Sequence, residues 1–128
     1  MKKRVAKSAD GIDLYYEIHG NGEPDLFFLH GIGGDADAWR YVRDILAASG
    51  HSTITMDLRG HGHSNHPRNL QSYNIADFSS DVAAIMDKEN IKKINLVGHC
   101  FGAVIAADLA VSFPEKLNSL SLLSPTYR

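Results

Sequence analysis

Residues 94–111 constrain the fold of this chain more than any other segment. An apolar run typical of a strand, residues 94–97, leads directly into Gly98-His99-Cys100-Phe101-Gly102, and an alanine-rich run typical of a helix follows over residues 103–111. The two glycines allow a strand and a helix to approach each other closely across a tight turn. Such a turn presents the side chain of Cys100 away from the backbone, at a helix N-terminus whose partial positive charge stabilises anions.

Segments typical of strands and of helices alternate along the rest of the chain. Asp10-Gly11 predicts a hairpin between two short strands, and apolar runs without alternation predict strands covered on both faces. The predicted strands are residues 3–8, 12–19, 26–29, 52–56, 94–97 and 117–123, and the predicted helices are 38–49 (with Asp37 as N-cap), 75–90 and 103–111. This alternation predicts an α/β fold, a mostly parallel doubly wound sheet with an N-terminal antiparallel hairpin.

Composition narrows the class of protein. A chain of 128 residues, 44% hydrophobic and 22% charged, is expected to form a single domain over residues 1–128. Its net charge of −2 argues against a nucleic-acid partner, and no apolar stretch is long enough for a membrane span. One cysteine permits no internal disulfide, so we expect a reducing, cytoplasmic location.

Three loops that follow predicted strands carry glycine and histidine. They contain His30-Gly31, the run Asp-Leu-Arg-Gly-His-Gly-His-Ser over residues 57–64, and Gly98-His99-Cys100-Phe101-Gly102. In this order, and with Phe113-Pro114 after the last helix, they resemble the α/β-hydrolase fold family. The resemblance covers residues 3–124 and implies the first six strands of the α/β-hydrolase core, ending where many members insert a cap or lid.

The resemblance also implies roles for individual residues. Cys100 would occupy the nucleophile position of a nucleophile elbow, where serine is usual, and the backbone N–H groups of Ile32 and Phe101 would form an oxyanion hole. His30 would stabilise its loop, and His99 would pack or hydrogen-bond beneath the elbow rather than act as the base. The family mechanism requires no cofactor. The expected substrate-pocket residues are His30, Gly31, Gly33, Gly34 and His99.

These roles imply a hydrolase that cleaves an ester or similar acyl bond of a small-molecule substrate. In the family, the triad acid follows the sixth or seventh strand and the catalytic histidine follows the eighth, and neither is found in this chain. We therefore expect the base and acid to come from a C-terminal half, in the same protein or in a companion chain. The alternative partner is a second copy of this chain, which would pair with an exposed sixth-strand edge that carries Leu120, Leu122 and Leu123.

Cys100 permits three interpretations. It is a natural cysteine nucleophile, an engineered replacement of serine, or a residue of a descendant that has lost catalysis. The third interpretation corresponds to a different function, a non-catalytic module that binds a small ligand, or to an inactive fragment.

The segment around Asp57 has competing interpretations as well. Asp57 is expected to hold Arg59 and the following turn rather than to serve as the triad acid. His61-Gly62-His63-Ser64-Asn65-His66 is one residue away from the H-x-H-x-D-H signature of metallo-β-lactamase-like hydrolases. Asn65 replaces its carboxylate ligand, however, and the segment fits the α/β-hydrolase loop, so no metal site is expected.

Overall fold

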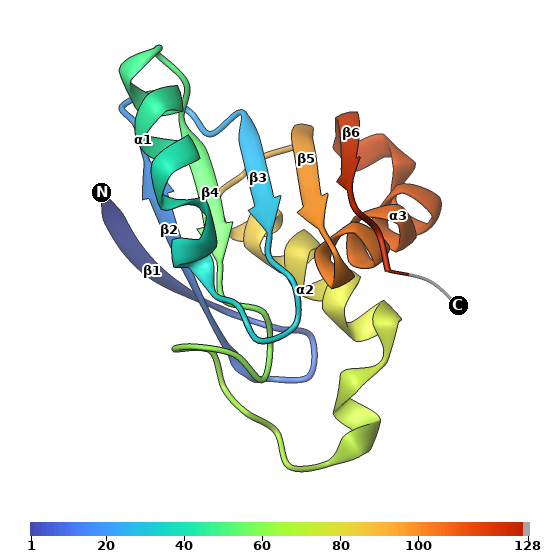
Figure 1. Ribbon diagram of the computed structural model, residues 1–128. Helices are drawn as coiled ribbons and strands as arrows, with labels where there is room; N and C mark the ends of the chain where they lie inside the picture. Colours follow the sequence, from blue (N-terminus) through green and yellow to red (C-terminus); the bar gives the residue numbers. More distant parts are fainter. Residues whose placement is uncertain (127–128) are drawn as a thin grey trace.

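A mixed six-stranded sheet forms the centre of the computed structural model, which describes residues 1–126 (Figure 1). The strand order is β1-β2-β4-β3-β5-β6. β1 pairs antiparallel with β2 and β2 with β4, whereas β4, β3, β5 and β6 run parallel. The predicted α/β fold with an N-terminal hairpin is thereby confirmed. The strands are β1 (Lys2–Lys7), β2 (Asp13–His19), β3 (Leu26–Leu29), β4 (Thr53–Met56), β5 (Ile94–His99) and β6 (Leu117–Leu123).

Helices lie on both faces of the sheet. α1 (Arg40–Ala48) lies over β2 and β4, and α2 (Ile75–Lys88) and α3 (Phe101–Ser112) pack together on the opposite face (Figure 1). Three short 3₁₀ helices complete the fold: η1 (Ala36–Trp39), η2 (Leu70–Tyr73) and η3 (Pro114–Lys116). Within residues 1–126, no helix combines the length and apolar character needed to cross a membrane.

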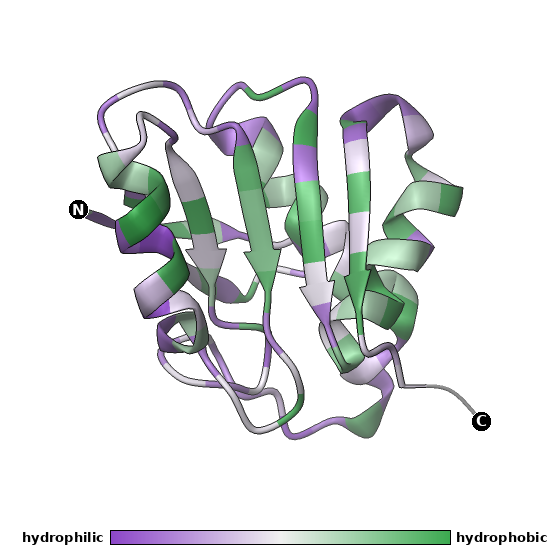
Figure 2. Cartoon of the chain, turned by 45° about the horizontal axis from the view of Figure 1, so that its top comes forward, coloured by the Kyte–Doolittle hydropathy of each residue, from purple (hydrophilic) through white to green (hydrophobic). Residues whose placement is uncertain are grey.

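The main core lies between the sheet and the pair α2 and α3. The apolar residues of the sheet are concentrated in its central strands (Figure 2), as expected for parallel strands covered on both faces. The side chains with no exposed surface in this core include Leu14, Tyr16, Phe27, Leu29, Ile54, Met56, Ile85, Met86, Leu96, Ile105 and Leu109.

The start of α1 differs from the sequence prediction. Asp37 does not cap this segment; the side chain of Asp35 does, by accepting a hydrogen bond of 2.9 Å from the N–H of Asp37. A 3₁₀ turn follows, and α1 begins only at Arg40. Ala36 and Trp39 are both buried, and the three-residue repeat of a 3₁₀ helix places them on the same side. Trp39 packs there against Phe28, with ring centroids 4.7 Å apart.

β6 is an edge strand, as predicted. Within residues 1–126 it pairs only with β5, and Leu120, Leu122 and Leu123 are 37%, 42% and 46% exposed. The strand carries no charged residue, so it lacks the side chains that usually discourage pairing with another chain.

Two glycines bring the N-terminus of α3 against the sheet. A Cβ atom on Gly102 would lie 2.3 Å from the carbonyl oxygen of Leu29, and one on Gly98 would lie 2.3 Å from the carbonyl oxygen of Gly102. Both distances are shorter than any real carbon–oxygen contact, so glycine is required at both positions. The end of β3, the end of β5 and the first turn of α3 consequently meet around Cys100.

We expect Gly102→Ala to lower the free energy of unfolding by about 3 kcal/mol, because the new methyl group must displace the backbone of β3. Urea unfolding followed by circular dichroism measures this change. Gly22→Ala is the matched control, since a Cβ atom at Gly22 would have no neighbour within 4 Å, and it should change stability by less than about 0.5 kcal/mol. Equal stability of the two variants would contradict the close contact.

Candidate active site

The backbone at Cys100 has a conformation that residues other than glycine rarely adopt. Its φ is 57° and its ψ is −118°, and it is the residue that precedes α3. Its N–H donates to the carbonyl oxygen of Leu123 at 3.0 Å, and its own carbonyl accepts from the N–H of Ala103 at 3.0 Å. Such strain costs on the order of 1–3 kcal/mol and persists where surrounding contacts impose it. Here β6 and α3 hold the turn from both sides.

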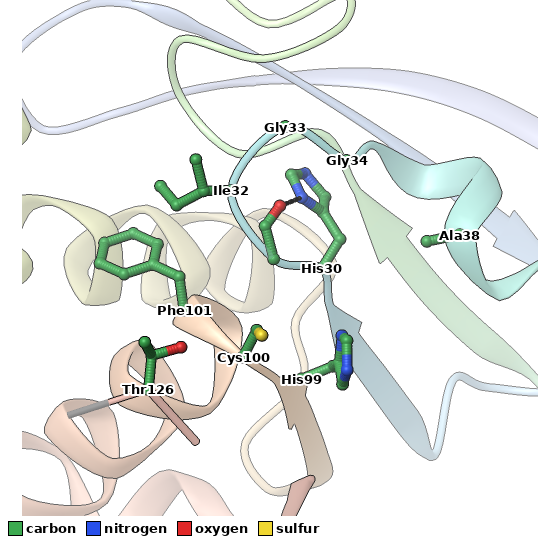
Figure 3. A pocket seen from close by; sticks show the side chains of 10 residues that line it. His30, Ile32, Gly33, Gly34, Ala38, His99, Cys100, Phe101 and Thr126 are labelled. Carbon is green, nitrogen blue, oxygen red and sulfur yellow. Dashed lines mark hydrogen bonds between the residues drawn. The ribbon is translucent and has the colours of Figure 1, made fainter. Parts of the chain in front are cut away.

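The half-buried side chain of Cys100 faces a pocket of about 530 Å³ at the carboxyl ends of β3 and β5. All eight site residues predicted from the sequence line this pocket (Figure 3). The loop after β3 passes so close that a Cβ atom on Gly31 would lie 3.0 Å from that of Cys100. The lining residues are His30, Gly31, Ile32, Gly33, Gly34, Ala38, His99, Cys100, Phe101 and Thr126.

Two backbone N–H groups of the pocket have no acceptor among the residues that the structure describes. Within residues 1–126, neither Ile32 nor Phe101 donates its N–H to a backbone or side-chain atom. Phe101 is the first residue of α3, where N–H groups have no partner inside the helix. The pocket therefore offers a thiol and two free donors suited to a negatively charged oxygen.

Comparison with known proteins identifies the family to which the chain is related. The family described as the alpha/beta hydrolase fold matches residues 24–127. The chain belongs to this family.

Several relatives of this α/β-hydrolase chain have names that indicate their activity. The dihydrolipoyllysine-residue acetyltransferase component of the acetoin cleaving system of Cupriavidus necator is 40% identical over 91% of this chain and 30% of its own length. RutD of Azorhizobium caulinodans, provisionally named a carbamate hydrolase, is 37% identical over 88% of this chain and 41% of its own.

Solved structures show the same fold. The crystal structure of the epoxide hydrolase VrEH1 from Vigna radiata superposes with a TM-score of 0.92 and 29% identity, over 99% of this chain and 41% of that one. The α/β-hydrolase chain thus spans less than half the length of these three proteins.

His30 ties the pocket loop to the loop after β4. Its ring is buried, its Nδ1 donates to the carbonyl oxygen of Gly31 at 2.7 Å, and its Nε2 accepts from the N–H of Leu58 at 3.0 Å. The tautomer is assigned from these partners. Burial lowers the pKa of His30 because a charged imidazole would lose its hydration.

The sequence predicts that His99 lies beneath the turn, but the structure places it elsewhere. Its side chain is exposed and lines the pocket on the side of Cys100 opposite Ile32 and Phe101 (Figure 3). The reason is its position on β5: α3 packs on the opposite face of this strand, and α1, on the face toward which His99 points, lies over β2 and β4 instead.

Asp57 holds the following turn, as predicted, but it does not hold Arg59. Its Oδ1 accepts from the N–H of Ala36 and its Oδ2 from the N–H of His63, both at 2.8 Å. Arg59 turns the other way and forms bonds of 2.7 Å to both carboxylate oxygens of Asp81 on α2.

The guanidinium group of Arg59 also binds Asp10, with two bonds of 3.0 Å to its carboxylate. This contact lowers the pKa of the half-exposed Asp10 to about 2. Desolvation has the opposite effect on the fully buried Asp81 and raises its pKa to about 6. Neither partner was identified from the sequence, because both are distant from Arg59 along the chain and nothing in their own surroundings marks them.

The histidines between residues 61 and 66 bind separate partners. His61 Nε2 accepts from the N–H of Gly33 at 3.0 Å, and His66 Nε2 donates to the carbonyl oxygen of Gly62 at 3.0 Å. His63 Nδ1 lies 3.4 Å from Asp57 Oδ2 with its side chain 79% exposed. Within residues 1–126, no cluster of three or more histidine, cysteine or acidic side chains is suited to holding a metal ion.

We expect the contact between His30 and Leu58 to weaken in acid. Because the folded state lowers the pKa of His30, the neutral ring contributes stability above its ordinary value of 6.5, and this contribution is lost as pH falls below that value. His30→Asn should lower the free energy of unfolding by about 1–3 kcal/mol at pH 7.5, since it leaves a buried N–H unpaired.

The stability difference between wild type and His30→Asn should shrink steadily as pH is lowered from about 6.5, in urea titrations at a series of pH values. His66→Asn, which replaces an exposed histidine, is the control. A difference that stays constant across this range would contradict the assigned role of the neutral ring.

Proposed function

We propose that this chain is part of a hydrolase that cleaves an ester or similar acyl bond with Cys100 as its nucleophile. One observation carries the proposal: the thiol on a strained turn shares a pocket with two backbone N–H groups that have no acceptor among the described residues 1–126. A thiol nucleophile needs such donors because attack on a carbonyl places negative charge on its oxygen.

In the proposed mechanism, the Sγ atom of Cys100 attacks the acyl carbon and the carbonyl oxygen becomes an oxyanion. The N–H groups of Ile32 and Phe101 bind this oxyanion, and each donor is worth about 3–4 kcal/mol at the transition state. The bond to the leaving alcohol then breaks, which leaves a thioester on Cys100. A base takes the thiol proton and returns it to the alcohol, and water later hydrolyses the thioester.

The base and its orienting acid are proposed to come from outside this chain. Within residues 1–126, no imidazole or carboxylate forms a hydrogen bond with Cys100 Sγ. The chain covers only 30–41% of the relatives described above. A C-terminal half, in the same protein or a companion chain, would supply a histidine and an acid. Self-association through β6 would instead cover the exposed edge of the sheet and would leave the base and acid unsupplied.

Two of the three relatives described above have names that indicate chemistry at an acyl carbon. Acetyl transfer and carbamate hydrolysis, named for two relatives, both proceed at a carbonyl group, whereas the third relative is named for an epoxide. The mostly apolar lining around Ile32, Ala38 and Phe101 suits the acyl part of a small molecule. A reducing cytoplasm would keep Cys100 as the free thiol that this mechanism needs.

A second candidate function is binding of a small ligand without catalysis. The lack of any base bound to Cys100 Sγ among residues 1–126 favours it. A binding module would retain saturable binding of a small ester and show no turnover, and the loss of its thiol would not change its affinity.

For the hydrolase, Cys100→Ala should abolish the rapid acylation produced by p-nitrophenyl acetate. Stopped-flow release of p-nitrophenolate, with peptide mapping by mass spectrometry, measures the rate and the modified residue. Slow acetylation of lysines provides the background in both proteins. Labelling that is unchanged in the variant and located on another residue would overturn the assignment of Cys100.

A further inference from the structure

The loop after β3, which lines the pocket, is held to the loop after β4 by a reciprocal exchange of hydrogen bonds. The N–H of Leu58, after β4, donates to the ring of His30, and the N–H of Gly33, after β3, donates to the ring of His61, each at 3.0 Å. The two rings contact each other edge to face, with centroids 5.0 Å apart. Each loop therefore supplies an imidazole acceptor to the other.

The ring of His61 is itself fixed in place. Its Nδ1 donates to the carbonyl oxygen of Arg59 at 3.1 Å, which leaves Nε2 as the acceptor for Gly33. The side chain of Arg59 is 1% exposed and is bound to Asp81 on α2 and to Asp10 in the turn between β1 and β2. His61 is thus anchored to a part of the fold that cannot shift without breaking a buried ion pair.

The loop over residues 31–34, which donates this hydrogen bond through Gly33, has few other restraints. Ile32 is 70% exposed, and Gly33 has a positive φ of 82°. In the described part of the chain, the carbonyl oxygen of Gly31 accepts bonds only from Gly34 and His30, which belong to the same loop. Within residues 1–126, the bond from Gly33 to His61 is the only hydrogen bond that joins residues 31–34 to another segment.

We infer that His61 is a positioning residue that sets the direction of the Ile32 N–H through its bond to the adjacent Gly33. This inference rests on the proposed function, in which Ile32 binds the oxyanion. His61 acts through the loop and does not touch the reacting atoms. Without an acceptor at this position, the peptide groups on either side of Gly33 can rotate, and the Ile32 donor loses its alignment with Phe101.

The test compares two reactions of the same thiol in the full chain. Acylation by p-nitrophenyl acetate develops an oxyanion, whereas alkylation by iodoacetamide forms a carbon–sulfur bond as iodide leaves and develops none. A change in the exposure or reactivity of Cys100 alters both rates. A misplaced Ile32 donor alters only the acylation rate. The ratio of the acylation rate to the alkylation rate therefore reports the position of the donor, separately from the reactivity of the thiol.

His61→Leu keeps similar bulk and removes the acceptor. We expect it to lower the acylation rate at least about tenfold, while the alkylation rate stays within about twofold. The expected loss is smaller than that from deleting an oxyanion donor outright, because the Ile32 N–H is still present. His61→Gln places an amide oxygen where it can accept from Gly33, and it should restore the ratio to within about threefold of wild type. His66→Ala, in the same loop, should leave both rates unchanged, because its ring is exposed and bonds to the carbonyl oxygen of Gly62, outside the pocket lining.

Hydrogen exchange measured by NMR reports the contact without any reaction. The Gly33 amide should be protected in wild type and His61→Gln and should exchange faster in His61→Leu, with other loop amides unchanged in all three proteins.

The outcomes separate this inference from the function on which it rests. Wild-type acylation of Cys100 that is no faster than that of the urea-unfolded chain would overturn the proposed function, and the inference with it. Rapid wild-type acylation with an unchanged ratio in His61→Leu would overturn the inference alone. An equal fall of both rates, or failure of His61→Gln to restore the ratio, would also overturn it.

Discussion

The rest of this site depends on the close backbone contact that glycine permits at positions 98 and 102. Because no Cβ atom stands between them and their neighbours, the first turn of α3 lies directly against the end of β3. That contact determines where the turn at Cys100 is placed and how close the loop after β3 comes to it. The positive φ of Cys100 is a consequence, since the chain must reverse from β5 into α3 within one residue.

Electrostatics in the neighbouring loop supports this arrangement from the other side. Asp57 and Arg59 are two residues apart and have different tasks: the buried carboxylate of Asp57 accepts from backbone N–H groups, and the guanidinium group of Arg59 binds the buried Asp81 and the half-exposed Asp10. An arginine with 1% of its side chain exposed is tolerated because Asp81 and Asp10 satisfy its donors. Removing one partner of such a pair usually costs about 3–5 kcal/mol, so the loop is tied firmly to α2.

The sequence predicts most of the fold because hydrophobic spacing and turn residues are local signals. Asp10-Gly11 identifies the hairpin, and the glycines around Cys100 identify the strand, the turn and the helix. The residues that line the pocket could also be predicted from the sequence, since the carboxyl ends of parallel strands lie at one edge of a sheet. These predictions needed no knowledge of distant contacts.

The errors and omissions all involve contacts between distant segments. Asp35 and Asp37 are both good caps, and the choice between them depends on the burial of Trp39 against Phe28, which the spacing does not reveal. His99 is exposed because α1 covers β2 and β4 rather than β5. The contact of His61 with Gly33 joins residues 28 positions apart, and a histidine in a glycine-rich turn suggests a ligand as readily as a hydrogen-bond acceptor.

Cys100 is the only cysteine in the chain, and it lies half-exposed in the wall of the pocket. A thiol-directed fluorophore or spin label would therefore attach at one known position without any substitution elsewhere. Because the strained backbone on both sides of the label is fixed by hydrogen bonds to Leu123 and Ala103, its motion would report the surroundings of the pocket rather than movement of its own attachment point. The chain thus contains a single natural attachment site for a label that would report what enters the pocket.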